Sequence, residues 1–185
     1  MEDKLLFFSS FLQFPREIGS IVPSSKFLTD EILKSIDFKN ARYIAEYGPG
    51  TGSITNEILK VARKDAKILC FEVNRKFCDY LKKNLKDKRL IIVNDSAENI
   101  KKYLERFNIP KIDYVVSGLP FSMLPDTKKF SIIKKTKNTL KAHGKFVVFQ
   151  FLNNFEKYLC NYFSKISIKF VPLNIPPCFV YICEK

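Results

Sequence analysis

The stretch EYGPGTGSIT, residues 46–55, has the spacing that is most indicative of chemistry. Gly48, Gly50 and Gly52 remove side chains at alternate positions, where a backbone must approach a ligand closely. A dinucleotide fingerprint needs a third glycine where this chain has Ser53, and a Walker loop needs a lysine that is absent from the stretch. The loop therefore predicts a different ligand, held mainly by backbone groups.

The E-x-G-x-G-x-G form of this loop resembles motif I of the class I S-adenosylmethionine (SAM) methyltransferases. In such folds an acid after the second strand accepts the ribose hydroxyls, and Glu72 in FEVN stands there; the alternative is an exposed glutamate at a strand end. The resemblance also implies an adenine contact within NDSAEN, residues 94–99, from either Asp95 or Ser96. The expected cofactor-binding residues are Glu46, Tyr47, Gly48, Gly50, Thr51, Gly52, Glu72, Val73, Asp95, Ser96, Ala97 and Ser117.

A second loop, SGLPFS at residues 117–122, follows the fourth apolar run and contains no charged residue. Class I methyltransferases present the methyl acceptor at this place. The resemblance therefore makes Ser117, Gly118, Leu119, Pro120 and Phe121 the expected acceptor loop, which would hold its substrate by shape and backbone groups. A plain connecting loop is the alternative.

Two families offer comparisons for the acceptor. The rRNA adenine dimethylases share E-x-G-P-G-x-G but carry Asn-(Ile/Leu)-Pro-Tyr at the acceptor loop, where Asn and Tyr handle a flipped adenine. This chain has Gly118 and Phe121 at those positions, and we expect no appended helical RNA-binding domain after the last strand.

The sequence is more similar to bacterial phospholipid N-methyltransferases, which convert phosphatidylethanolamine stepwise towards phosphatidylcholine. The matching pieces are FPREIGSIVPSS, EYGPGTGSIT, FEVNRKF, VVSGLPFSMLP, GKFVVFQF and NIPPCFVY. This family often has Leu where the chain has Phe121, a difference that bears on the acceptor.

The reaction that this resemblance implies is in-line methyl transfer from SAM to a neutral amine, with S-adenosylhomocysteine as product. The protein then mainly aligns the reactants and excludes water. Tyr47, Tyr114 or a water molecule would take the amine proton. Phe121, or less well Tyr47, would contact the methylated head group by cation–π attraction; the alternative for Phe121 is a core aromatic.

Strand-like and helix-like stretches alternate from about residue 40 onwards, which predicts βαβ units in a parallel sheet. We expect an α/β, Rossmann-like class I methyltransferase fold with a seven-stranded, mostly parallel sheet, helices on both faces and an antiparallel last strand. The strands are predicted at 41–47, 66–73, 89–95, 112–118, 144–151, 166–171 and 178–184, and the helices at 53–64, 75–85, 97–107, 126–142 and 153–163.

Residues 1–40 lie outside this alternation and are expected as an N-terminal helical segment beside a SAM-binding domain at 41–185, within one compact domain. KLLFFSSFLQF, residues 4–14, has Leu5, Phe8 and Phe11 on one helical face. This helix either packs over the site or docks on a membrane. A further helix after Pro23 would be capped by Ser24 or Ser25.

The strongly basic composition favours an anionic partner. The net charge is +13, which suits an acidic membrane surface or nucleic acid, the latter less well for want of an RNA domain. Five cysteines without a CxxC pair predict reduced thiols, and one histidine, in the KAHGK turn, argues against a metal site. We expect a cytoplasmic protein without a signal peptide, peripherally bound to the membrane. An RNA or small-amine N-methyltransferase and a non-catalytic binding module are the alternatives.

Overall fold

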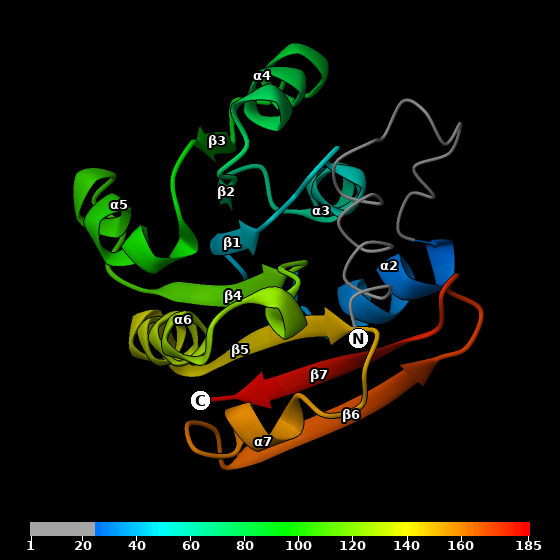
Figure 1. Ribbon diagram of the computed structural model, residues 1–185. Helices are drawn as coiled ribbons and strands as arrows, with labels where there is room; N and C mark the ends of the chain where they lie inside the picture. Colours follow the sequence, from blue (N-terminus) through cyan, green and yellow to red (C-terminus); the bar gives the residue numbers. More distant parts are fainter. Residues whose placement is uncertain (1–24) are drawn as a thin grey trace.

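A computed structural model describes residues 25–185 of the protein. The helix expected over residues 4–14 lies outside these described residues. Residues 25–185 contain a seven-stranded sheet in the order β3-β2-β1-β4-β5-β7-β6, with helices on both faces (Figure 1). The predicted α/β fold class is confirmed.

Five strands run parallel and place their carboxyl ends on one side. They are β1 (Tyr43–Tyr47), β2 (Lys67–Phe71), β3 (Leu90–Val93), β4 (Ile112–Ser117) and β5 (Leu140–Gln150). The hairpin of β6 (Lys165–Val171) and β7 (Cys178–Glu184) completes the sheet, and β7 is antiparallel to both its neighbours, as predicted. The side where β1–β5 end is called the carboxyl edge, and ligands bind at this edge in open parallel sheets.

The helices connect these strands. They are α2 (Lys26–Lys34), α3 (Ser53–Val61), α4 (Arg75–Asn84), α5 (Ile100–Arg106), α6 (Asp126–Thr139) and α7 (Glu156–Leu159), with short 3₁₀ turns η1 (Ala97–Asn99) and η2 (Phe121–Met123). Ser25 caps α2, because its hydroxyl oxygen accepts a hydrogen bond from Leu28 N at 3.2 Å.

Most element boundaries shift by a few residues from the prediction, and two differences change the local structure. The helix expected over 153–163 is limited to α7, because Tyr162 N and Phe163 N both donate to the Leu159 carbonyl in a tightened turn that buries the Phe163 ring. The KAHGK turn is absorbed into the start of β5, where His143 has a φ of 61°.

The alternation along β1 shows how the sheet separates two cores. Ala45 and Tyr47 point to the face that α5, α6 and α7 cover, whereas Ile44 and Glu46 point to the face of α2 and α3. Because α2 joins this second core through buried Leu28 and Ile32, the segment from residue 25 onwards packs directly on the sheet.

Candidate active site

The glycine loop lies between β1 and α3, at the carboxyl edge. Its start is held by a hydrogen bond from Gly48 N to the Phe71 carbonyl, at 2.9 Å. Gly50 has a φ of 55°, and a Cβ atom placed on it would meet nothing within 4 Å. A side chain would cost about 1–2 kcal/mol in this left-handed conformation. The backbone at Gly50 is therefore open to a ligand.

Glu72 follows β2 and faces the glycine loop. Its Oε1 accepts a hydrogen bond from Asn74 N at 2.8 Å, and its Oε2 accepts one from Gly50 N at 3.4 Å. Burial raises the pKa of this carboxyl group, although its backbone hydrogen bonds oppose the shift. Two predicted cofactor residues, Gly50 and Glu72, are thus adjacent, although they are separated in the sequence.

Asn94 fixes the loop that carries Glu72. Its Nδ2 donates to the Glu72 carbonyl at 2.9 Å and to the Val73 carbonyl at 3.0 Å. Val73 itself is 71% exposed beside Glu72. Asn94 was not among the predicted site residues. Its place directly after an apolar strand could have indicated a role at the carboxyl edge.

Asp95 and Ser96 organise the turn after β3. Asp95 Oδ1 accepts hydrogen bonds from Ser96 N at 2.7 Å and Asn99 Nδ2 at 2.8 Å, and Oδ2 accepts one from the Tyr103 hydroxyl at 2.9 Å. These bonds, led by that from Asn99, lower the pKa of Asp95. Ser96 Oγ accepts from Glu98 N at 3.2 Å. Both side chains therefore shape the loop that they occupy, and Ala97 is buried behind it.

Glu46 and Tyr47 lie beneath the glycine loop, on opposite faces of β1. The Glu46 carboxylate accepts a hydrogen bond from the Thr55 hydroxyl at 2.6 Å, and burial raises its pKa to about 7. The Tyr47 hydroxyl lies 3.2 Å from Thr136 Oγ1 on α6, and burial raises its pKa. Tyr47 is a core side chain, so the predicted roles of its ring and hydroxyl towards an acceptor are not supported.

The acceptor loop is held from two sides. Ser117 is fully buried, and its Oγ accepts a hydrogen bond from Leu119 N at 3.3 Å. Gln150, at the end of β5, donates from Nε2 to the Leu119 carbonyl at 2.8 Å. Gln150 was missed by sequence reasoning, because nothing local indicates a bond across 31 positions.

The prediction that Phe121 lies against the acceptor is corrected by its position. The ring is fully buried, with its centroid 4.6 Å from that of Phe155 and 6.5 Å from that of Phe146. The core alternative therefore holds for this side chain. Ser117 is likewise buried, whereas Leu119 and Pro120 of the predicted acceptor loop remain partly exposed.

Gly118 brings the acceptor loop against the glycine loop. Its N–H donates to the Tyr47 carbonyl at 2.9 Å, and a Cβ atom placed on it would lie 3.1 Å from the Gly48 carbonyl oxygen and 3.3 Å from Cζ of Phe149. A side chain at this position would be tight, because the Gly48 carbonyl or the Phe149 ring would have to move by a few tenths of an ångström. The predicted cofactor loop and the predicted acceptor loop are therefore in direct contact.

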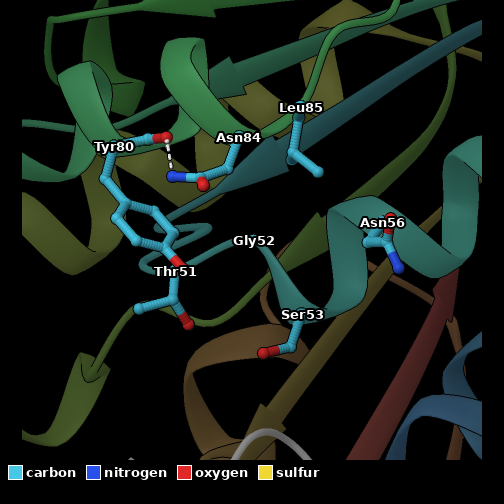
Figure 2. A pocket seen from close by; sticks show the side chains of 7 residues that line it. All are labelled: Thr51, Gly52, Ser53, Asn56, Tyr80, Asn84 and Leu85. Atoms are coloured by element: carbon cyan, nitrogen blue, oxygen red, sulfur yellow. Dashed lines mark hydrogen bonds between the residues drawn. The ribbon is translucent and has the colours of Figure 1, made fainter.

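A hollow of about 370 Å³ lies beside the glycine loop, between α3 and α4 (Figure 2). Within it, Asn84 Nδ2 donates to the Tyr80 carbonyl at 2.7 Å. Its lining combines two predicted residues with five that sequence reasoning did not select: Thr51, Gly52, Ser53, Asn56, Tyr80, Asn84 and Leu85. Thr51, a residue of the predicted cofactor loop, therefore lies where that loop meets the hollow.

Residues 25–185 hold neither a metal-binding cluster nor a membrane-spanning helix. This part of the chain contains no cluster of His, Cys, Asp and Glu that would hold a metal ion. No helix among the same residues is long and apolar enough to cross a membrane. The five cysteines are free, and all but Cys160 are buried.

The comparison with protein families decides the class. A family model described as ribosomal RNA adenine dimethylase matches residues 15–161, well over half of the chain. This chain belongs to the ribosomal RNA adenine dimethylase family. It is accordingly a class I methyltransferase, and its cofactor is SAM, as predicted. The sequence motifs had favoured phospholipid N-methyltransferases over this family. The family match shows a class I methyltransferase, but it does not identify the methyl acceptor.

Individual relatives are named for two different kinds of methyl acceptor. An ornithine lipid N-methyltransferase from Singulisphaera acidiphila is 27% identical over the whole chain and 97% of its own length. The ribosomal RNA small subunit methyltransferase A of Mesomycoplasma hyopneumoniae strain J is 29% identical over 64% of this chain, which spans 45% of that relative. Among solved structures, precorrin-6y C5,15-methyltransferase from Geobacter metallireducens has the same fold, with a TM-score of 0.70 at 16% identity over 90% of this chain and 93% of that one.

Proposed function

We propose that this enzyme transfers methyl groups from SAM to the amine of a lipid head group, with phosphatidylethanolamine as the candidate acceptor. The observation that carries this proposal is the contact at Gly118, where the close approach of two loop backbones disfavours a side chain. An acceptor loop without a polar side chain at this position suits an amine presented on an apolar molecule. It does not suit a nucleobase that needs hydrogen bonds to its edge.

The comparison over full length supports the same class of acceptor. The relative that aligns with the whole chain is named for N-methylation of a lipid that carries an amine. Phosphatidylethanolamine and ornithine lipids both present a primary amine beside long acyl chains, so the two differ mainly in the group that bears the amine.

The cofactor residues have a consistent arrangement for SAM. We propose that the Glu72 carboxylate accepts the ribose hydroxyls, because it already accepts the Gly50 N–H at the open edge of the loop. We propose that the exposed Val73 side chain packs against the adenine ring and that the Asp95–Ala97 turn contacts the adenine amino group. The backbone of Gly48–Gly52 then faces the methionine portion.

The protein's contribution to the reaction is alignment and exclusion of water. Bound SAM supplies an activated methyl group on a sulfonium centre. The contact between Gly118 and Gly48 brings the acceptor loop next to the cofactor loop, which favours in-line transfer. Tyr114 is placed three residues before the end of β4 and packs against the core, and Tyr47 is buried. We therefore propose that water, rather than either tyrosine, accepts the proton that the amine loses.

Methylation of rRNA adenine is the second candidate, favoured by the family model and the 29% identical relative. The test uses purified enzyme, methyl-labelled SAM and four separate acceptors: vesicles with phosphatidylethanolamine, vesicles with ornithine lipid, vesicles with neither, and ribosomal RNA. Label confined to phosphatidylethanolamine is the expected result. Label in ornithine lipid alone would keep the lipid class and change the head group, whereas label in RNA alone would overturn the proposal.

The proposal includes a location and a domain role. An enzyme acting on membrane lipids would work at the cytoplasmic surface as a peripheral protein, where the charge of +13 favours anionic lipids. We propose that residues 1–40 cover the site or dock on this surface, while 41–185 bind SAM. Vesicle binding that survives deletion of residues 1–14, with SAM binding also intact, would exclude docking by the predicted helix.

A further inference from the structure

Large apolar side chains are exposed together on one half of the carboxyl edge. Leu152 follows β5 and is 50% exposed, while Leu173 and Ile175 lie in the β6–β7 turn and are 60% and 74% exposed. We call these three residues the apolar rim. Apolar side chains that are exposed at the same edge of a fold are candidates for an interaction site.

The pairing of the strands puts the rim beside the site. Gln150 at the end of β5 pairs with Phe179 at the start of β7, so the β6–β7 turn lies at the same edge as the ends of β1 and β4. Figure 1 shows this turn on the side to which the arrowheads of β1, β4 and β5 point, next to the start of α2.

One rim residue, Leu152, lies close in the chain to Gln150, which bonds to the acceptor loop. Gln150 donates to the Leu119 carbonyl at 2.8 Å, and Leu152 follows Gln150 by two residues. The Leu152 carbonyl in turn accepts a hydrogen bond from the Tyr181 hydroxyl on β7 at 3.3 Å. An acceptor lying on the rim would therefore be next to the loop Ser117–Phe121.

The β6–β7 turn is fixed in an arrangement that keeps its apolar side chains outside. Asn174 is buried between them; its Nδ2 donates to the Pro176 carbonyl at 2.7 Å, and its Oδ1 accepts from Ser25 N at 3.2 Å. Because Asn174 points inward, its neighbours Leu173 and Ile175 on either side are left pointing outward.

Positive charge flanks the rim. Lys26 follows Ser25 at the start of α2, and Lys169 lies near the end of β6; both are exposed. An apolar protrusion edged with lysines matches the interface of an anionic bilayer, where apolar groups enter the acyl boundary and lysines meet the head groups.

We propose that Leu152, Leu173 and Ile175 insert into the surface of an anionic lipid bilayer and bring a head-group amine to the loop Ser117–Phe121. This inference rests on the proposed lipid function and adds the element that contacts the membrane. It is separate from docking by residues 4–14, since it concerns a turn that is fixed within the described fold.

The test replaces both turn residues in the full chain, as Leu173→Gln/Ile175→Gln, so that charge is unchanged. Val61→Gln is the matched control: Val61 is 51% exposed, but it lies at the end of α3, away from the carboxyl edge. Sedimentation without SAM measures binding to vesicles of phosphatidylethanolamine and phosphatidylglycerol. Labelled SAM then measures methylation of these vesicles and of a short-chain phosphatidylethanolamine kept monomeric.

We expect the double variant to lose at least tenfold in vesicle affinity, about 1.4 kcal/mol, and to methylate vesicle lipid correspondingly more slowly. SAM affinity and methylation of the monomeric lipid should match the parent enzyme, and Val61→Gln should behave as the parent throughout. Vesicle binding equal to that of the parent would overturn the proposal. The proposal would also be overturned if the variant binds vesicles normally but melts at a lower temperature. That result would indicate that residues 1–24 cover the rim.

The two proposals fail in different ways. If the parent enzyme methylates no lipid but its vesicle binding depends on Leu173 and Ile175, the lipid function fails and the membrane contact stands. If the double variant methylates vesicle lipid as fast as the parent, the lipid function stands and the apolar rim fails.

Discussion

The two halves of the carboxyl edge carry different kinds of side chain. On the side of β3, β2 and β1, carboxylates and amides bond to backbone groups: Glu72 with Gly50, Asn94 with Val73, and Asp95 with Ser96. On the side of β5, β7 and β6, the exposed side chains include the apolar rim of Leu152, Leu173 and Ile175. The acceptor loop after β4 lies between the two halves.

This difference follows the chemistry that each half would meet. SAM has hydroxyl, amino and charged groups in fixed positions, and fixed polar partners select such a molecule. A lipid offers a small head group and a large apolar surface, so an apolar edge and a close backbone contact suffice. Variants that act on one half alone therefore test whether the halves carry separate functions.

The largest expected effect is on the cofactor half. Glu72→Gln keeps the size of the side chain but removes the charge that would accept the ribose hydroxyls. Hydrogen bonds to charged groups contribute about 1.5–3 kcal/mol each, so we expect SAM affinity to fall by at least tenfold and up to about 100-fold. Calorimetric titration measures this change.

The control for Glu72→Gln is Glu57→Gln, on the partly exposed face of α3, where the carboxylate pairs with Lys60 and Asn56 of its own helix. SAM affinity and the thermal midpoint should both stay at the parental values in this control. An unchanged SAM affinity in a folded Glu72→Gln protein would remove the ribose assignment and leave the glycine loop as the only support for the cofactor site.

A smaller and different effect is expected where the halves meet. In Gly118→Ala the new Cβ would lie 3.1 Å from the Gly48 carbonyl oxygen, so the acceptor loop must move away. Overpacking of this kind costs about 1–3 kcal/mol. We expect kcat to fall by about tenfold while SAM affinity changes by less than about threefold.

The matched variant is Gly50→Ala, whose Cβ meets no neighbouring atom but whose residue must hold a φ of 55°. Its strain falls on the cofactor loop, so SAM affinity should weaken more than kcat. If both variants change SAM affinity and kcat to the same extent, the two loops act as one unit, and the division of the edge into halves is wrong.

The sequence identified the loops better than it identified their side chains. Gly48, Gly50, Gly52 and Glu72 follow strand ends, and a local pattern of apolar runs suffices to locate those ends. Tyr47 and Phe121 could not be placed in this way, because their burial depends on α6 and on the Phe155 ring, which are distant in the chain. Asn94 and Gln150 were missed for the same reason: their partners lie 21 to 31 positions away.

The smallest expected effect concerns Glu46, which is buried beneath the glycine loop. Burial raises its pKa from 4.5 to about 7 in the folded protein, so between these pH values the folded state binds more protons than the unfolded state. Its contribution to stability therefore declines as pH rises from about 4.5 to about 7. Each unit of raised pKa corresponds to about 1.4 kcal/mol.

Glu46→Gln should remove this contribution, because a glutamine stays neutral and can still accept the Thr55 hydroxyl. We expect the fall in thermal midpoint between pH 5 and pH 8 to be a few degrees smaller in the variant than in the parent, since 1 kcal/mol shifts the midpoint by about 2–4 °C in a chain of this size. Part of the fall should persist, because burial also raises the pKa of Glu72. Equal falls in both proteins would mean that Glu46 is already charged at pH 5, and that water or the chain before residue 25 solvates it.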